Sequence, residues 1–350
     1  MTKVLFFLPN SVGGAERMVI TIAKMLPTAE YECKFVIVGK NKGDIVRFIP
    51  EQYTVDLIKI PNIWCFGFTK ILLYIKSDKP DIVYSSQMYL NSRVTFAGHL
   101  AGCRVVIRNA NYMSTCSWVK TMLCKLTYPM ADVIISQQEE MAQDIEKTLN
   151  ISLEKVVVLH NPIDKSTIEN RLKDCTNPYP KETQTKFVWV GRFDYTKGQD
   201  VAVEAFSKMY ERVDNGHLYL VGKYNKDTPF VESLLSQIKE LGLSDRVHLT
   251  GFDSNPYRWI KYSDCFVLPS RIEGLPNTLI ESQYIGIPAA ATRCVPIIER
   301  IISEGINGYI AQSENPESLA NAMLKAYKLK NIKMTYHGAE PEDVIRLFKF

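Results

Sequence analysis

The chain has 350 residues, of which 46% are hydrophobic and 23% are charged, and its formal net charge is +4. This balance excludes an intrinsically disordered protein, and no apolar run approaches the roughly 20 residues that cross a bilayer. The eight cysteines are scattered without a C-x-x-C pair, which indicates free thiols in a reducing cytosol and argues against a structural zinc site. The length is sufficient for two cores of ordinary domain size.

Segments typical of strands and helices alternate along the chain. The first of them, residues 3–8, predicts a strand rather than a signal peptide. Helices are expected between the strands, for example at 15–26, 64–76 and 91–102. The expected strands begin near Lys3, Tyr31, Tyr53, Asp81, Arg104, Asp132 and Val156, and then near Phe187, His217, Arg246, Asp264, Pro288 and Gly308.

This alternation predicts parallel sheets with crossover helices, and a polar interruption divides it into two. We therefore expect an α/β protein with two doubly wound, Rossmann-like domains at residues 1–165 and 186–330, joined by a linker at 166–185. The last segment, 331–350, contains a short helix expected to cross back to the first domain. Because ligands of such sheets bind beyond the carboxyl ends of the strands, the site is expected in a cleft between the facing domains.

A pair of glycines, Gly13 and Gly14, separates the first strand from the first helix. Glycines allow the backbone to approach a ligand closely. Their spacing differs from the dinucleotide pattern G-x-G-x-x-G, so the sequence does not support a nicotinamide cofactor.

A basic region rich in aromatic residues lies between Asp56 and Asp132. Its nine Lys and Arg residues exceed its two acids by seven, and the expected helices at 63–76 and 112–128 carry Trp64, Phe66 and Trp118. Cations and aromatic side chains together suit an anionic membrane surface. Alternatively, the aromatic side chains pack on the first sheet and the lysines face solvent. A nucleic-acid partner is not expected, because no known module matches.

The turn after the expected strand at Phe187 carries two cations. Arg192 and Lys197 bracket this turn, so both can reach one anion, Arg192 bidentately and Lys197 as a point charge. The alternative is that both are ordinary surface charges.

Residues 269–281 place two carboxylates eight positions apart. Glu273 is expected on a loop at the carboxyl end of a strand, and Glu281 inside a helix that begins at Asn277. The start of that helix suits a phosphate, whereas the acids should accept hydrogen bonds from neutral hydroxyl groups. The pattern indicates a ligand with a sugar at each end and a diphosphate between them. Two solvated glutamates on a surface helix are the alternative.

Taken in order, these motifs resemble family 4 of the retaining glycosyltransferases, which have the two-domain GT-B fold. The matching segments are 13–17, 161–164, 191–198, 273–281 and 305–308, and the resemblance extends from about residue 3 to about residue 328. It implies transfer of a sugar from a nucleotide-diphosphate sugar to a glycan acceptor, with retention of anomeric configuration. It also implies that no divalent metal or other cofactor takes part.

On this hypothesis the catalytic residues are Glu273, Arg192 and Lys197. The two cations neutralise the departing diphosphate, Glu273 accepts hydrogen bonds from the donor sugar, and Glu281 accepts them from the ribose. The backbone N–H groups of Thr278 and Leu279 face the diphosphate. The remaining residues of the expected donor site are Gly14, Gly274, Leu275 and Asn277.

Many relatives carry a histidine after the fifth strand of the first domain, and this chain does not. Either Arg108 or Asn111 is expected to serve on the acceptor side instead, or the acceptor is held differently. The expected acceptor is a polyprenyl-linked glycan in the assembly of O-antigen, capsule or lipopolysaccharide. The protein is then cytoplasmic and peripheral on the inner face of the membrane. The alternatives are a nucleotide-sugar epimerase or hydrolase of the same fold, or a non-catalytic subunit of a transferase complex.

Overall fold

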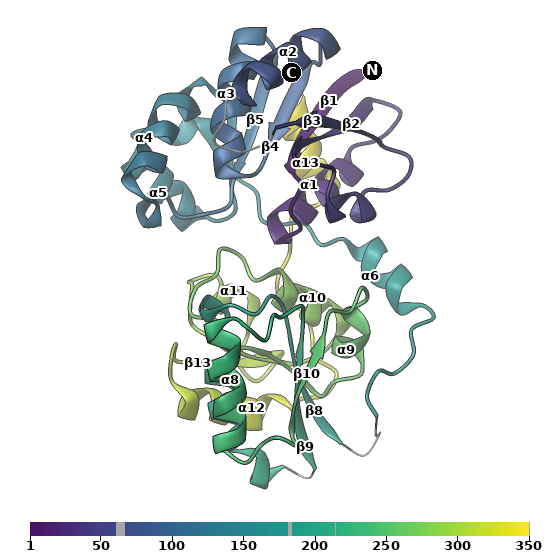
Figure 1. Cartoon of the computed structure of the whole chain (residues 1–350), viewed down its shortest axis with the longest axis vertical. Helices are drawn as coiled ribbons and strands as arrows, with labels where there is room; N and C mark the ends of the chain where they lie inside the picture. The colour runs from purple at the N-terminus through teal and green to yellow at the C-terminus, as the bar shows by residue number, and fades with distance from the viewer. Residues whose placement is uncertain (61–66, 181–183, 214, 350) are drawn as a thin grey trace. The chain divides into compact units, whose positions relative to one another are not determined.

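The computed structural model describes residues 1–60, 67–180, 184–213 and 215–349, and the chain divides into two compact units (Figure 1). The first unit comprises Met1–Ile163 together with Gly338–Phe350, and the second comprises Asp164–His337. Each is built on one parallel sheet, as the alternation predicted. The described strands begin within two residues of their predicted positions.

The first sheet has seven strands in the order β3-β2-β1-β4-β5-β6-β7. Side chains alternate between its faces: Phe6 enters the core on one face, and Leu5 and Phe7 enter the core on the other. The strands are β1 Thr2–Pro9, β2 Tyr31–Gly39, β3 Thr54–Lys59, β4 Ile82–Ser85, β5 Arg104–Asn109, β6 Val133–Ser136 and β7 Val156–Val158. The helices are α1 Gly14–Met25, α2 Gly67–Asp78, α3 Met88–Ala101, α4 Trp118–Thr127, α5 Glu139–Leu149 and α13 Pro341–Phe348.

The second sheet has six strands in the order β10-β9-β8-β11-β12-β13. They are β8 Thr185–Val190, β9 Gly216–Val221, β10 Val247–Gly251, β11 Cys265–Leu268, β12 Ala289–Thr292 and β13 Gly308–Ala311. Its helices are α6 Lys165–Leu172, α7 Gln199–Ser207, α8 Pro229–Glu240, α9 Tyr257–Lys261, α10 Asn277–Ile285, α11 Ile298–Ile301 and α12 Pro316–Ala326. Among the described residues, no helix is both long enough and apolar enough to cross a bilayer.

The segment expected to be a linker, 166–185, contains most of helix α6. Asp164 caps this helix, accepting a hydrogen bond from the backbone N–H of Thr167 at 3.1 Å. Only Ile168 of the helix is buried. Because so little of α6 is apolar, its sequence lacks the periodic pattern that identifies the other helices, and residues 181–183 lie outside the described part of the chain.

The C-terminal helix α13 belongs to the first unit, where Figure 1 shows it in yellow near α1. Its Phe348 ring is fully buried, with its centroid 6.0 Å from that of Phe6 and 5.8 Å from that of Tyr84. A reciprocal capping box between Glu340 and Asp343 starts the helix. The end of the chain therefore completes a core that the first strands begin.

Replacing Phe348 with alanine should lower the free energy of unfolding of the first unit by about 3 kcal/mol, because the substitution leaves a cavity among aromatic rings. Urea denaturation followed by tryptophan fluorescence measures this loss. Lys349→Ala is the matched control, since Lys349 is exposed one residue further on. Equal midpoints for the two variants would contradict the packing role of α13.

Candidate functional site

The predicted donor residues of the second unit lie where the strand order of the sheet reverses. β8 and β11 are neighbours although β9 and β10 separate them in the sequence. Doubly wound sheets bind ligands at such a switch point, beyond the carboxyl ends of the strands. The turn after β8 and the loop after β11 meet there, and they bring Lys197 and Glu273 together with Nζ and Oε2 2.7 Å apart.

The turn that carries Lys197 has a fixed conformation. Asp194 accepts hydrogen bonds from the backbone N–H of Thr196 at 3.0 Å and from its hydroxyl at 2.6 Å, and these bonds hold the pKa of the Asp194 carboxyl below its usual value. Gly198 follows with φ at +67°, and a Cβ atom there would lie 2.1 Å from the carbonyl oxygen of Pro269. Only glycine allows the turn and the loop to approach this closely.

Arg271 joins the loop after β11 to the turn after β8. Its backbone N–H donates to the carbonyl of Thr196 at 2.8 Å. Its guanidinium forms a bidentate pair with Asp200 at 2.7 and 2.8 Å and lies over the ring of Tyr195. The sequence offered no signal for this contact, because the partners are 71 residues apart and no motif spacing relates them.

Glu273 has a second hydrogen-bond partner and little exposure to solvent. Its Oε1 accepts from the hydroxyl of Ser270 at 2.8 Å, and its side chain is only 9% exposed. Ser270 is in turn held through its carbonyl by the hydroxyl of Thr292 at 2.6 Å. Burial, with the negative charge of Glu273 as the second cause, raises the pKa of the nearby Cys294 thiol to about 12. This thiol is therefore protonated at neutral pH.

Helix α10 begins at Asn277, as predicted, with no side chain capping its first turn. The N–H of Leu279 donates to the carbonyl of Pro276 at 3.0 Å, so this expected phosphate donor already has an acceptor in the structure. Glu281 lies on α10, where its Oε1 accepts from the hydroxyl of the buried Tyr257 at 3.2 Å. Gly274 and Leu275 lie in the loop just before the helix.

Arg192 is not part of the Lys197–Glu273 pair. Its side chain is 77% exposed, and its nearest carboxylate is that of Asp194, 3.9 Å away. The next residue, Phe193, turns toward the core and packs edge-on against Trp189. Arg192 is therefore a solvent-exposed cation outside the buried pair.

In the first unit, Gly14 is the first residue of α1, and a carboxylate lies close to it. Glu16 is almost fully buried and accepts hydrogen bonds from Ser11 at 3.1 Å and Gln87 at 2.8 Å. A negative charge at the start of this helix is favourable for the helix itself. It makes the start of α1 less favourable for a phosphate than the glycine pair alone indicates.

The two expected acceptor-side residues differ in accessibility. Arg108 is buried and directs its guanidinium to Ser86 at 3.0 Å and to Asn161 at 2.5 Å, so its charge is used inside the protein. Asn111 is exposed, and its carbonyl accepts from the side chain of Asn109. Of the two, Asn111 is the one whose side chain an acceptor can reach.

The two helices of the basic region bury different amounts of apolar surface. α2 packs Ile71 and Ile75 into the core. α4 instead exposes five large apolar side chains, which we call the α4 face, and Trp118 among them is 75% exposed. Trp64 and Phe66 lie outside the described residues. The members of the α4 face are Trp118, Val119, Met122, Leu123 and Leu126.

The described part of the chain contains no group of three or more His, Cys, Asp or Glu side chains placed to hold a metal ion.

Two family models match the chain. Residues 12–167 match "Glycosyltransferase Family 4", and residues 173–338 match "Glycosyl transferases group 1". Together they account for most of both units.

Curated relatives show the same likeness. An uncharacterized glycosyltransferase of Methanocaldococcus jannaschii is 28% identical over 67% of this chain and 62% of its own length. The N-acetylgalactosamine-N,N'-diacetylbacillosaminyl-diphospho-undecaprenol 4-alpha-N-acetylgalactosaminyltransferase of Campylobacter jejuni is 25% identical over 93% of this chain and 91% of its own. The capsular polysaccharide biosynthesis glycosyltransferase CapH of Staphylococcus aureus is 24% identical over 81% of this chain and 79% of its own.

Among solved structures, HepE of Anabaena in complex with UDP-glucose superposes with a TM-score of 0.77 at 18% identity. The match covers 94% of this chain and 90% of HepE. At this level of identity the likeness shows the fold.

Replacing Arg271 with glutamine should destabilise the second unit by about 2 kcal/mol, because the exchange leaves Asp200 without its charged partner. Arg293→Gln is the matched control, since its pair with Glu299 is exposed on both sides and should contribute less than about 1 kcal/mol. Thermal unfolding measured by circular dichroism compares the two variants. A melting temperature for Arg271→Gln no lower than that of the control would contradict the role of Arg271 in joining the loop after β11 to the turn after β8.

Proposed function

We propose that this chain, which belongs to the glycosyltransferases of family 4 and group 1 and has their GT-B fold, is a retaining enzyme of surface polysaccharide assembly. Its donor is a nucleotide-diphosphate sugar, and its acceptor is a polyprenyl-linked glycan. Two relatives support this assignment by name, one acting on a diphospho-undecaprenol-linked sugar and the other in capsular polysaccharide biosynthesis.

The pairing of Lys197 with Glu273 is the observation that carries the proposal. In a nucleotide-diphosphate sugar, the diphosphate is bonded directly to the anomeric carbon. The protein group that binds the phosphate must therefore lie beside the group that accepts hydrogen bonds from the sugar hydroxyls. An ammonium group 2.7 Å from a carboxylate provides this combination. An ammonium group has three N–H donors, and one bond to Glu273 leaves two for phosphate oxygens.

In the proposed reaction, the bond between the anomeric carbon and the diphosphate oxygen breaks, and negative charge develops on the leaving group. Lys197 is already fixed beside that position and stabilises the charge without reorganisation. Arg192 adds a second cation, and the backbone N–H of Thr278 contributes at the start of α10. Glu273 orients the donor sugar through its hydroxyl groups, and Glu281 accepts from the ribose.

Retention is proposed to follow from attack on the same face that the diphosphate leaves. The acceptor hydroxyl forms the new bond to the anomeric carbon, and its proton passes to an oxygen of the departing diphosphate. No protein nucleophile and no divalent metal take part in this scheme. The product keeps the anomeric configuration of the donor.

The α4 face supports peripheral binding to the inner face of the cell membrane. Its apolar side chains are flanked by the exposed Lys120 and Lys125, and α4 contains no acidic residue. Apolar side chains can enter the acyl boundary while cations contact anionic headgroups. A lipid-linked acceptor would then lie in the same layer as the enzyme.

Replacing Lys197 with alanine should reduce turnover by about 100-fold or more, because the leaving group loses its fixed cation. The assay measures release of nucleoside diphosphate from a panel of UDP-, GDP- and dTDP-sugars in the presence of membrane lipid extract. Lys208→Ala is the matched control, since Lys208 follows α7 in the same unit and is paired only loosely with Glu204, at 3.8 Å.

Equal turnover for Lys197→Ala and Lys208→Ala would contradict the role of Lys197. Release that does not depend on the lipid extract would indicate a hydrolase instead. Adding EDTA to the same assay should leave turnover largely intact, and complete loss of activity would contradict the metal-free scheme.

Replacing Lys76, Lys120 and Lys125 together with glutamine should weaken binding to phosphatidylglycerol vesicles by about tenfold or more, and the effect should be larger at low salt. The matched control removes three exposed lysines of the same unit that lie outside the basic region, Lys42, Lys147 and Lys155. Co-sedimentation measures both variants. An equal loss of vesicle binding in the two variants would contradict a specific membrane contact, because net charge alone would then explain the effect.

A further inference from the structure

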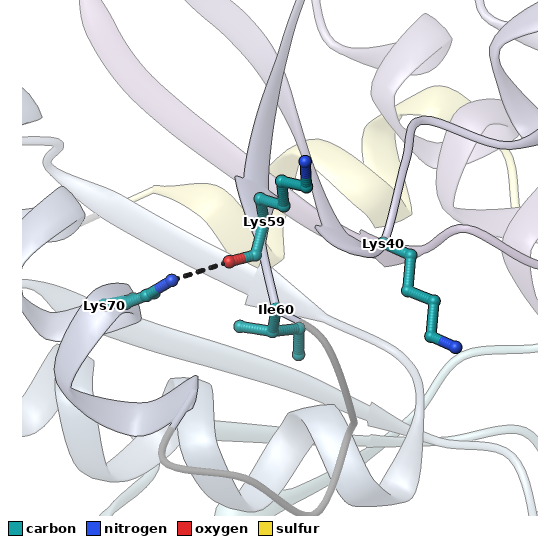
Figure 2. Close-up of a pocket in the computed structure, with 4 residues that line it drawn as sticks. All are labelled: Lys40, Lys59, Ile60 and Lys70. Carbon is teal, nitrogen blue, oxygen red and sulfur yellow. Dashed lines mark hydrogen bonds between the residues drawn. The ribbon is translucent and has the colours of Figure 1, made fainter.

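A pocket of about 490 Å³ lies at the carboxyl ends of β2 and β3, beside the first turn of α2 (Figure 2). It is lined by Lys40, Lys59, Ile60 and Lys70, and we call it the three-lysine pocket. Its volume is within the range typical of small-molecule sites. All four lining residues belong to the first unit, whereas Lys197 and Glu273 belong to the second.

The three lysines gather positive charge around this pocket. No carboxylate of the described residues forms an ion pair with Lys40, Lys59 or Lys70. Two other lysines of the same sheet are paired: Lys3 binds Asp78 at 2.7 Å, and Lys34 binds Asp78 and Asp56 at 2.8 and 3.3 Å. The carboxyl ends of β2 and β3 therefore carry cations that no acid in the described part of the chain pairs with.

The three side chains differ in how firmly they are held. Lys70 donates a hydrogen bond from Nζ to the carbonyl of Lys59 at 2.8 Å, which fixes one ammonium group beside the end of β3. Ile60 is buried and forms an apolar part of the wall. Figure 2 shows the ammonium groups of Lys59 and Lys40 extending away from that hydrogen bond. Both side chains are exposed, and an anion in the pocket would draw them inward, because like charges no longer repel once a counter-charge lies between them.

We propose that the three-lysine pocket binds the diphosphate group of a lipid-linked acceptor, an inference that rests on the proposed function. Lysine side chains bind phosphate groups as point charges and need no planar geometry. The volume exceeds what a diphosphate fills and leaves room for the adjoining sugar. Lys70 and the exposed Leu73 lie three residues apart on one side of α2, so a lipid chain leaving the pocket meets an apolar side chain.

Lysine acylation footprinting of the full chain tests the proposal. The protein is treated with an acetylating reagent, and the modification rate at each lysine is read by mass spectrometry with and without inorganic pyrophosphate. Rates at Lys40, Lys59 and Lys70 should fall by about fivefold or more once the site is mostly occupied. The control lysines Lys79, Lys147 and Lys155 should keep their rates. Protection at Lys197 by a nucleoside diphosphate reports separately on the donor site.

Two further arms identify the source of the phosphate. Vesicles containing a polyprenyl diphosphate should protect the pocket, and phosphatidylglycerol vesicles without it should not. Equal protection of pocket and control lysines by pyrophosphate, or protection by phosphatidylglycerol vesicles alone, would overturn the proposal. If the pocket is protected but no nucleoside diphosphate protects Lys197, the diphosphate site stands and the proposed transferase function fails.

The variant Lys40→Gln/Lys59→Gln/Lys70→Gln should raise the KM for the lipid-linked acceptor by about tenfold or more while leaving the KM for the donor unchanged. A variant that merely misfolds would lower kcat and leave both KM values unchanged, because the fraction that is folded binds both substrates normally. An unchanged acceptor KM would also overturn the proposal.

Discussion

The short ion pair between Lys197 and Glu273 is the constraint on which the candidate donor site depends. Removing a charge from water is costly, and a partly buried ion pair is therefore weak evidence for stability. The surrounding structure nevertheless fixes it from both sides: Gly198 allows the close approach, Arg271 joins the two segments, and Ser270 occupies the second oxygen of Glu273. An arrangement that costs desolvation yet is held this firmly is what a preorganised binding site requires.

The two units differ in whether their cations are paired with acids, and this difference suggests that they bind different phosphate-bearing partners. In the second unit, Lys197 and Arg271 each have a carboxylate within 2.7 Å, so cations are positioned by acids. In the first unit, the lysines at the carboxyl ends of β2 and β3 have no such partner among the residues that the structure describes, and the exposed apolar side chains of α4 lie among further cations. A fixed charge suits a defined donor diphosphate. Exposed charges without a paired acid suit a lipid-borne phosphate and a membrane surface.

The sequence was sufficient to predict the strands, because buried parallel strands appear as apolar runs. It also predicted that the turn at Lys197 and the loop at Glu273 lie at the same edge of the sheet, because the carboxyl ends of parallel strands share one edge. It could not predict the partners of Arg271 or Arg108, which depend on where distant loops fold. It also missed α6, whose single buried residue gives no periodic signal. The exposure of Arg192 and the packing of Phe193 against Trp189 are likewise set by the tertiary structure. The binding roles of these residues remain predictions.

A crystal structure of the protein with an intact nucleotide-diphosphate sugar tests the central claim most directly. The account predicts that a diphosphate oxygen lies within about 3 Å of Lys197 Nζ and that a hydroxyl of the transferred sugar lies at a similar distance from Glu273. A diphosphate bound elsewhere, with Lys197 and Glu273 touching only each other, would contradict it.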